Sequence, residues 1–336
     1  MSDIVLEIKD LSTHFFTDQG EIPAVDGVTL KVKEGQILGI VGESGCGKSV
    51  TSLSIMKLIP RPPGKIVNGE INFKGENIVH ASTKRMREIR GNEIAMIFQE
   101  PMTSLDPLFT IGNQMREAIR IHEKVSKKEA QRRSIERLKT VGLPNPETVI
   151  HEYPHQLSGG MRQRVMIAMA IACDPDLLIA DEPTTALDVT IQAQILDVMR
   201  QLNEEKKMAI LLITHDLGVV ADMCERVVVM YAGQVVEEGT VREILKQPTH
   251  PYTKGLIRSL PKLHEHEQKL YSIPGTVPRA RVGVTGCRFA PRCEFAFDRC
   301  FNENPGLYTM EADHRSRCFL YDEEEVDRGE ASTLRS

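Results

Sequence analysis

The sequence predicts an α/β protein built around a phosphate-binding loop, and three observations support this prediction. The motif GESGCGKS at 42–49 follows the apolar run QILGIV and precedes the helical run VTSLSIMKLI. This is the order of strand, loop and helix that such a loop requires. Two further apolar runs, at 176–181 and 208–216, have the length and composition of strands buried in a parallel sheet. Because helical stretches alternate with these strands, a mixed core is expected.

The remaining elements fit the same fold class. Short β-rich runs open the chain as IVLEIKDL, VDGVTLKV and GQILGIVG. The stretch 126–143 places apolar residues among charges at roughly helical spacing, which predicts a helix. The run 226–239 predicts a β-hairpin with a turn near Ala232 and Gly233.

Composition divides the chain into three predicted parts. A length of 336 residues favours two domains. Proline becomes frequent after residue 247, so we place a boundary near residue 250. This gives a nucleotide-binding domain at 1–250 and a cysteine-containing region at 251–320. The charged segment 321–336 is poor in apolar residues and is expected to be disordered.

Charge and hydropathy exclude some classes of protein. The net charge is −5, whereas nucleic-acid binders usually carry a basic domain or stripe, so no nucleic-acid partner is expected. The sequence contains no run of about 18 apolar residues, so no transmembrane helix is expected. The first residues lack the pattern of a secretory signal. We therefore expect a cytosolic protein. In a reducing cytosol, clustered cysteines are more often metal ligands or redox centres than disulfides.

The glycines of the first motif explain its chemistry. Gly42, Gly45 and Gly47 permit a tight turn and let backbone N–H groups approach phosphate oxygens. The helix start adds the positive end of a dipole. Lys48 is expected to reach the β- and γ-phosphates of ATP, and the Ser49 hydroxyl to bind Mg²⁺. A plain glycine-rich turn is the alternative, which the flanking strand and helix disfavour. The predicted nucleotide-binding residues of the loop are Gly42, Glu43, Ser44, Gly45, Cys46, Gly47, Lys48 and Ser49.

An acidic pair and a histidine follow the two apolar strands. Asp181 ends the run LLIAD, where its carboxylate can bind Mg²⁺. Glu182 comes next and is the candidate base for an attacking water. His215 follows the run LLIT and is expected to contact the γ-phosphate. Taken alone, each position could be a solvated or structural strand end; their order after the phosphate loop favours a catalytic site of Lys48, Glu182 and His215.

The motif LSGGM at 157–161 completes a pattern that resembles the ATP-binding subunits of ABC transporters. The resemblance runs in order through the first 250 residues. It implies a P-loop cassette with a RecA-like core, an antiparallel β subdomain and a helical subdomain. In that family two cassettes enclose two ATP molecules, and the signature of one cassette contacts the γ-phosphate held by the other. The implied signature residues are Leu157, Ser158, Gly159, Gly160 and Met161.

The same resemblance implies roles for three more positions. Phe15 is similar to the aromatic residue that stacks on adenine, with Phe16 as the alternative. Gln99 is similar to the glutamine that senses Mg²⁺ and the membrane subunit. Asp188 ends the run TALD at 185–188, which resembles the loop that joins two cassettes. The predicted magnesium ligands are Ser49, Gln99 and Asp181.

A narrower resemblance concerns the transported solute. The segments 98–114, 250–261 and 272–278 are similar to the ATPase subunits of oligopeptide and dipeptide importers. This implies an ATP hydrolase at the cytoplasmic face of the membrane that drives peptide uptake. The implied partners are a second, related ATPase subunit, two transmembrane permease subunits and an extracytoplasmic peptide-binding protein. The alternatives are import of nickel or another peptide-like solute, a soluble ATPase acting on nucleic acid, and a regulatory binder that uses ATP as a switch.

Four cysteines near the C-terminus form the second candidate site. Cys287, Cys293, Cys300 and Cys318 lack the paired spacing of a zinc ribbon. Four thiolates can hold a [4Fe–4S] cluster, and the resemblance includes importer subunits that carry one in this region. We expect the iron–sulfur cluster, with zinc and free or oxidised thiols as alternatives. Ligation would then stabilise a segment that lacks a core of its own. Three arginines, which either offset thiolate charge or lie on the surface, are Arg288, Arg292 and Arg299.

Overall fold

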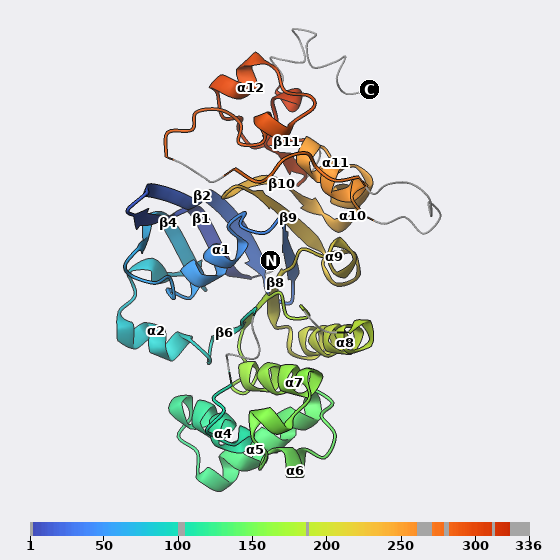
Figure 1. Ribbon diagram of the computed structural model, residues 1–336. Helices are drawn as coiled ribbons and strands as arrows, with labels where there is room; N and C mark the ends of the chain where they lie inside the picture. Colours follow the sequence, from blue (N-terminus) through green and yellow to red (C-terminus); the bar gives the residue numbers. More distant parts are fainter. Residues whose placement is uncertain are drawn as a thin grey trace.

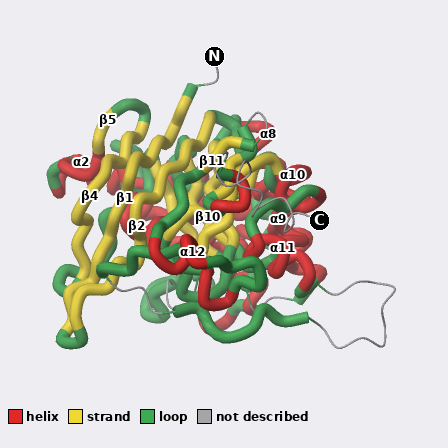
Figure 2. Tube along the Cα trace, turned by 90° about the horizontal axis from the view of Figure 1, so that it is seen from above, coloured by secondary structure: helices red, strands yellow, loops and turns green. Residues whose placement is uncertain are grey.

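The computed structural model describes residues 3–99, 105–185, 188–260, 271–278, 282–310 and 313–322. Figure 1 shows two β-sheets in the middle of the molecule, a group of helices below them and the C-terminal segments above them. Figure 2, turned by 90°, shows the C-terminal helices lying over the strands of both sheets. The predicted α/β class is confirmed.

The smaller sheet has four antiparallel strands in the order β2-β1-β4-β5. Residues of alternating position on β1, such as Leu6 and Ile8, are fully buried against the main core. The first two strand-rich runs of the sequence are therefore confirmed as strands. The bounds are β1 (Ile4–Thr17), β2 (Gly20–Lys33), β4 (Gly64–Phe73) and β5 (Glu76–Asn77).

The larger sheet has eight strands in the order β11-β12-β10-β9-β3-β8-β7-β6. Neighbours from β9 to β6 run parallel, and every residue of β3, β7 and β8 is buried. β9 and β10 form the predicted hairpin, with positive φ at Ala232 and Gly233. The bounds are β3 (Ile37–Val41), β6 (Ile94–Ile97), β7 (Leu177–Asp181), β8 (Ala209–Ile213), β9 (Arg226–Tyr231), β10 (Gln234–Thr240), β11 (Tyr308–Thr309) and β12 (Arg315–Ser316).

The two faces of the larger sheet carry different partners. Leu178, Ala180 and Leu212 belong to an apolar cluster with helical residues, whereas Ile179 and Ile213 pack with the smaller sheet. This alternation is the period of two that strand geometry dictates. The inner strands are thus covered on both sides, which fixes the positions of their carboxyl ends.

Helices surround the sheets and also form the lower lobe in Figure 1, which contains α4 to α7. Their bounds are α1 (Lys48–Ile55), α2 (Thr83–Ile89), α4 (Ile111–His122), α5 (Lys127–Thr140), α6 (Pro146–Val149), α7 (Gly159–Ala170), α8 (Val189–Lys206), α9 (Leu217–Met223), α10 (Val241–Lys246), α11 (Pro251–Arg258) and α12 (Asp298–Asn302). Short 3₁₀ turns occur at η1 (Ile78–His80), η2 (Pro154–Gln156), η3 (Ala290–Arg292) and η4 (Phe319–Tyr321).

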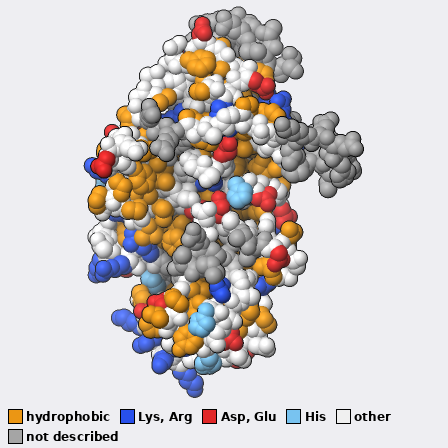
Figure 3. Space-filling model, in the orientation of Figure 1, with side chains coloured by type: hydrophobic (Ala, Val, Ile, Leu, Met, Phe, Trp, Pro, Cys, Tyr) orange, Lys and Arg blue, Asp and Glu red, His pale blue; other side chains and the backbone are white. Residues whose placement is uncertain are grey.

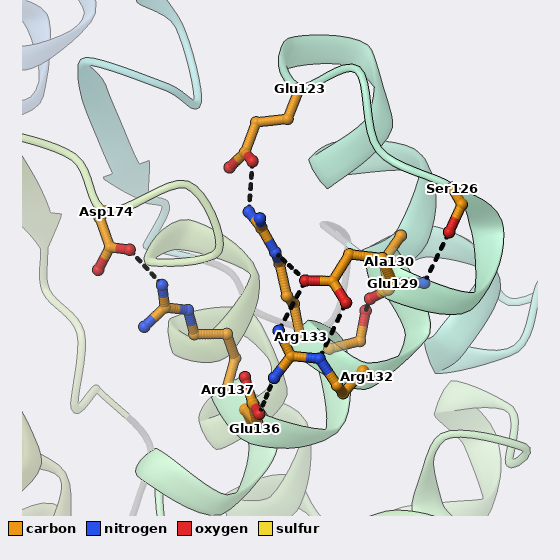
Figure 4. Close-up of polar contacts among 10 residues, drawn as sticks. Glu123, Ser126, Glu129, Ala130, Arg132, Arg133, Glu136, Arg137 and Asp174 are labelled. Carbon is orange, nitrogen blue, oxygen red and sulfur yellow. Dashed lines mark hydrogen bonds and ion pairs between the residues drawn. The ribbon is translucent and has the colours of Figure 1, made fainter.

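The predicted helix at 126–143 is α5, and its start follows from its sequence. The Ser126 side chain accepts a hydrogen bond from the Glu129 backbone N–H at 3.2 Å, a cap that contributes about 1 kcal/mol. Glu129 also binds Arg132 and Arg133 on the exposed face (Figure 4). Such exposed ion pairs each contribute only about 0–1 kcal/mol, so the buried residues Ala130 and Leu138 mainly determine how α5 packs.

The C-terminal region is joined to the larger sheet. β12 pairs with β10, so the sheet continues across the predicted boundary near residue 250, which stays a prediction. A small apolar cluster forms around Ala290, Cys300 and Phe319, so the region has a minor core, contrary to expectation. Of the predicted tail, Asp322 lies in the folded region and binds Tyr308, while 323–336 lies outside the described residues.

Candidate functional site

The phosphate loop connects β3 to α1, and its backbone requires glycine at two positions. A Cβ at Gly42 would lie 2.2 Å from the Met230 carbonyl oxygen, and one at Gly47 would lie 2.5 Å from the Ala24 carbonyl oxygen. Both glycines also have positive φ, at 152° and 105°, which side-chain-bearing residues rarely adopt. The loop therefore packs tightly against β2 and β9, which gives its N–H groups a fixed direction.

Lys48 begins α1, and its side chain turns back into the loop. Its ammonium donates to the carbonyl oxygens of Gly42 at 2.7 Å and Glu43 at 3.1 Å. The residue is 95% buried, so its charge is held at one place. Cys46 is fully buried in the core, and burial raises the pKa of its thiol, consistent with a packing role.

Ser49 and Asp181 meet beside the loop, although 132 residues separate them. The Ser49 hydroxyl donates to the Asp181 carboxylate at 3.2 Å, and Ser52 donates to its other oxygen at 3.4 Å. Burial raises the pKa of Asp181 above its usual range, against the effect of these bonds. Magnesium prefers oxygen ligands, and its charge would offset this desolvation. The two side chains therefore fit the predicted Mg²⁺ site.

Glu182 gathers the other predicted catalytic residues around its carboxylate. Gln99 donates to it at 3.2 Å, Thr185 donates at 3.0 Å, and the His215 ring nitrogen lies at 3.3 Å. Burial raises the pKa of Glu182, but the contacts with Thr185 and His215 lower it by a larger amount, so the pKa lies below its usual value. The carboxylate is thus ionised at neutral pH, as a base requires. Its φ of +49° is unusual for a residue with a side chain.

The structure leaves the choice between the two adenine-stacking candidates open. Both phenylalanines lie near the end of β1. Phe16 is 49% exposed, whereas Phe15 is half-buried and faces Gly64 on β4. An exposed ring has more surface to offer a base, and a half-buried ring is better fixed in orientation.

The signature motif lies in a different part of the chain from the phosphate loop. Ser158 caps α7 by accepting from the Met161 backbone N–H at 3.3 Å, and Leu157 is buried beside it. A Cβ at Gly159 would meet nothing within 4 Å, whereas one at Gly160 would contact Ile191. In Figure 1, α7 belongs to the lower lobe and α1 lies in the upper part. One chain therefore does not bring its own signature to its own phosphate loop.

Asp188 marks the start of α8. Its side chain accepts from the Ile191 backbone N–H at 2.9 Å, and the next residue, Val189, is 82% exposed. The two residues before it, 186–187, lie outside the described residues, as do 100–104 of the segment after Gln99 and residue 261 of the proline-rich segment.

A large hollow among the described residues lies elsewhere. It has a volume of about 610 Å³ and lies at the amino ends of the parallel strands, beside Glu34 and Met208. Ligands of open α/β sheets bind at the carboxyl ends, where Asp181 and His215 lie. We therefore assign the chemistry to the residues around the phosphate loop.

All four C-terminal cysteines line one small cavity of about 20 Å³, which also contains Phe289 and Phe319. No disulfide joins cysteines of the described residues. In the part of the chain that the structure describes, no group of three or more His, Cys, Asp or Glu side chains is arranged to hold a metal ion. The structure thus brings the predicted ligands together without the geometry of a metal site.

The protonation of these thiols agrees with that geometry. Burial raises the pKa of Cys293 to about 12, and it raises the pKa values of Cys287 and Cys318 as well. Metals bind thiolates, so these thiols would have to lose their protons on binding a metal. A cation or cluster would favour this loss, and four sulfur donors around one cavity suit zinc or an iron–sulfur cluster.

Each of the three arginines of this region pairs with another group of the protein. Arg288 binds Asp26 and the Ala232 carbonyl oxygen. Arg292 binds the Glu43 carboxylate at 2.8 Å. The third, Arg299, forms ion pairs with Glu303 and Asp322 and stacks on Phe319.

Sequence reasoning missed two contacts of the phosphate loop. The Tyr252 hydroxyl accepts a hydrogen bond from the Glu43 backbone N–H at 2.8 Å, and Arg292 binds the Glu43 carboxylate. The residues in contact are 209 and 249 positions apart, so no local spacing in the sequence could predict these contacts. The proline-rich segment containing Tyr252 was the available signal.

Comparison with known proteins gives a consistent result. Residues 25–185 match the family described as "ABC transporter", and residues 236–300 match "Oligopeptide/dipeptide transporter, C-terminal region". The chain is 51% identical to the "Probable peptide ABC transporter ATP-binding protein y4tR" of Sinorhizobium fredii, over 96% of each chain. It is also 51% identical to the "Oligopeptide transport ATP-binding protein AppD" of Bacillus subtilis, over 96% of this chain and 99% of that protein.

A solved structure shares the cassette fold. The dimeric post-hydrolysis state of the ATP-binding cassette MJ0796, bound to ADP and Pi, superposes with a TM-score of 0.64 at 30% identity. It covers 70% of this chain and 99% of the cassette. Searching the described residues for a helix of the length and hydropathy needed to cross a membrane finds none.

Proposed function

The chain belongs to the ATP-binding subunits of ABC transporters, in the group with an oligopeptide/dipeptide transporter C-terminal region, and we propose that its ATP hydrolysis drives import of di- and oligopeptides. The observation that carries the catalytic part is the convergence of Gln99 and His215 on the Glu182 carboxylate, beside the Ser49–Asp181 pair. Ser49 lies on α1, and the other groups lie at or just after the ends of β6, β7 and β8.

The chain's own residues divide the chemistry of hydrolysis among them. Lys48 and the loop N–H groups bind the phosphates of ATP. Ser49 and Asp181, with Gln99, would hold Mg²⁺, and the ion would supply positive charge that offsets the phosphate charge. Glu182 accepts a proton from the attacking water, and His215 contacts the γ-phosphate. Because phosphoryl transfer depends mainly on positioning and charge stabilisation, these contacts supply what the reaction needs.

The second half of each ATP site comes from a partner subunit. Ser158 and Gly159 are exposed on the lobe that lies away from the phosphate loop, so they suit the nucleotide held by another cassette. Asp188, at the start of α8, lies where the loop between cassettes is expected. We infer a heterodimer with a second, related ATPase subunit.

The lobe of α4 and α5 supplies the contact with the permease subunits. Leu108, Phe109 and Ile121 are 78%, 51% and 68% exposed, and a hollow of about 520 Å³ lies beside Phe109, Arg116 and Ile121. Figure 3 shows hydrophobic and basic side chains together on this lobe. Exposed apolar residues beside a hollow suit a protein partner. We infer that the subunit lies peripherally at the cytoplasmic face of the membrane, with an extracytoplasmic peptide-binding protein on the other side.

The cysteine cavity is proposed to hold a [4Fe–4S] cluster, with zinc as the alternative. Four cysteines line one cavity, and their sulfurs form a donor set that suits either group. Anaerobically purified protein should contain about four iron and four sulfide per chain for this cluster type. Cys293→Ser should lose both, while Cys173→Ser, a cysteine outside the cavity, should keep them. Zinc in place of iron would support the alternative, and no metal would contradict both.

The transport assignment is tested by uptake. A strain that lacks the chromosomal gene for this protein expresses either the wild type or Lys48→Ala from a plasmid. Uptake of labelled di- and oligopeptides and of ⁶³Ni²⁺ is then measured in both strains. We expect peptide uptake only with the wild type. Uptake of nickel but not of peptides would contradict peptide import while leaving the ATPase intact. Equal peptide uptake with both chains would contradict the catalytic assignment.

A further inference from the structure

The C-terminal cysteine region contacts the phosphate loop directly through one buried ion pair. The Arg292 guanidinium donates to both carboxylate oxygens of Glu43, at 2.8 Å and 3.1 Å. The Arg292 side chain is 5% exposed and the Glu43 side chain 30% exposed, so solvent screens the pair less than it screens a surface ion pair. Two parallel bonds of this kind also fix orientation, which a single contact does not.

Glu43 is held at each of its polar groups. Its backbone N–H donates to the Tyr252 hydroxyl at 2.8 Å, and its carbonyl accepts from Lys48 at 3.1 Å. Its carboxylate binds Arg292. The position of the second loop residue is therefore set jointly by the catalytic lysine and by two residues beyond the predicted boundary near residue 250.

Arg292 is itself held by the C-terminal region. Its Nε donates to the Pro274 carbonyl oxygen at 2.7 Å, and the guanidinium lies over the rings of Tyr231 and Phe289, 5.7 Å and 6.0 Å from their centres. The next residue, Cys293, lines the cysteine cavity. Figures 1 and 2 show this region lying over β10 and β2, close to the strands that flank the phosphate loop.

The pair also matters for charge. A carboxylate on the second residue of a phosphate loop would repel an anionic nucleotide. Arg292 neutralises it, and the bidentate geometry keeps the carboxylate directed toward the C-terminal region. Loss of Arg292 would therefore both release the loop and leave a negative charge beside the phosphates.

We propose that Arg292 is a positioning residue for ATP: acting through Glu43, it fixes the phosphate loop and neutralises it, so that the C-terminal cysteine region sets the affinity for nucleotide. This inference rests on the proposed binding of ATP by the phosphate loop. Arg292 does not touch the nucleotide, so it acts on binding more than on the chemical step.

A double-mutant cycle on ATP affinity tests this. The Kd of ATP is measured by calorimetry without Mg²⁺, so that no turnover occurs, for the wild type, Arg292→Gln, Glu43→Gln and the double variant. We expect Arg292→Gln to raise Kd at least about fivefold, but by less than about twofold in the Glu43→Gln background, because the interaction partner is already gone. In assembled transporter, KM for ATP should rise with little change in kcat.

Two controls separate the outcomes. Arg315→Gln removes another ion pair of the C-terminal region, with Glu238, and should leave Kd unchanged. Lys48→Ala should abolish binding; if it does not, the proposed phosphate site fails and this inference fails with it. If Lys48→Ala abolishes binding while Arg292→Gln binds normally, or acts equally in both backgrounds, only the inference fails. Should Arg292→Gln not fold, Arg292→Lys replaces it, since it keeps the charge but loses the bidentate bond.

Discussion

Replacing Glu237 by Gln should destabilise the junction between β10 and the C-terminal region. Glu237 is fully buried, and its Oε1 accepts from the Thr249 backbone N–H, the Thr249 hydroxyl and the His314 ring, each at 2.8 Å. Its Oε2 accepts from the His250 backbone N–H at 2.9 Å. All of these partners are donors, and a carboxylate can accept from every one of them.

The magnitude follows from what an amide can no longer do. In Glu237→Gln, an NH₂ group replaces one carboxylate oxygen and faces a donor from which that oxygen accepted a hydrogen bond. One unsatisfied buried donor costs about 1–3 kcal/mol. The remaining bonds lose their charge assistance, which roughly halves their strength. We expect Glu237→Gln to lower the free energy of unfolding by about 2–5 kcal/mol.

Urea unfolding provides the assay. The chain has no tryptophan, so far-ultraviolet circular dichroism replaces tryptophan fluorescence. The matched control is Glu238→Gln, the neighbouring residue, which pairs with the partly exposed Arg315 and should cost about 1 kcal/mol or less. Equal losses for the two variants would refute the assignment of Glu237 as the main polar contact of this junction.

Three further predictions follow from single features. Burial would raise the pKa of Glu237, but hydrogen bonds from His314 and neighbouring groups outweigh it and lower the pKa below its ordinary value of 4.5. The ionised carboxylate therefore stabilises the fold above about pH 4.5, and the free energy of unfolding should decrease as the pH falls further. Glu237→Gln should reduce this dependence on pH. Gly42→Ala should abolish ATP binding in a filter assay, because its Cβ would overlap the Met230 carbonyl oxygen; normal binding would contradict the tight loop. Phe109→Glu should weaken co-purification with the permease subunits without changing ATP affinity, whereas normal co-purification would remove α4 and α5 from the docking surface.

The phosphate site was predictable because its chemistry is local. GESGCGKS fixes loop, lysine and hydroxyl within eight residues, and Asp181 and His215 each end an apolar run. Because the carboxyl ends of parallel strands lie at the same edge of a sheet, the order of these motifs along the chain was enough to predict that Glu182 lies beside the loop. In the structure, Glu182 contacts Gln99 and His215.

Other features depend on partners far along the chain. β4 contains Gly and Asn residues that disfavour strands, and it forms because β1 pairs with it, for example Ile8 with Ile71. The Glu43–Arg292 pair links residues 249 positions apart, and an arginine carries no local signal of its partner. The cysteine cavity is predicted to be a metal centre, and the sequence could not show how its four thiols lie relative to one another.

Glu182 is proposed to be the base that activates water for ATP hydrolysis. The most direct test measures ATP binding and phosphate release by Glu182→Gln in the assembled transporter, with the exposed Glu34→Gln as control. We expect binding to be retained and turnover to fall by at least about 100-fold, while Glu34→Gln behaves as the wild type. Turnover near the wild-type rate in Glu182→Gln would contradict the account.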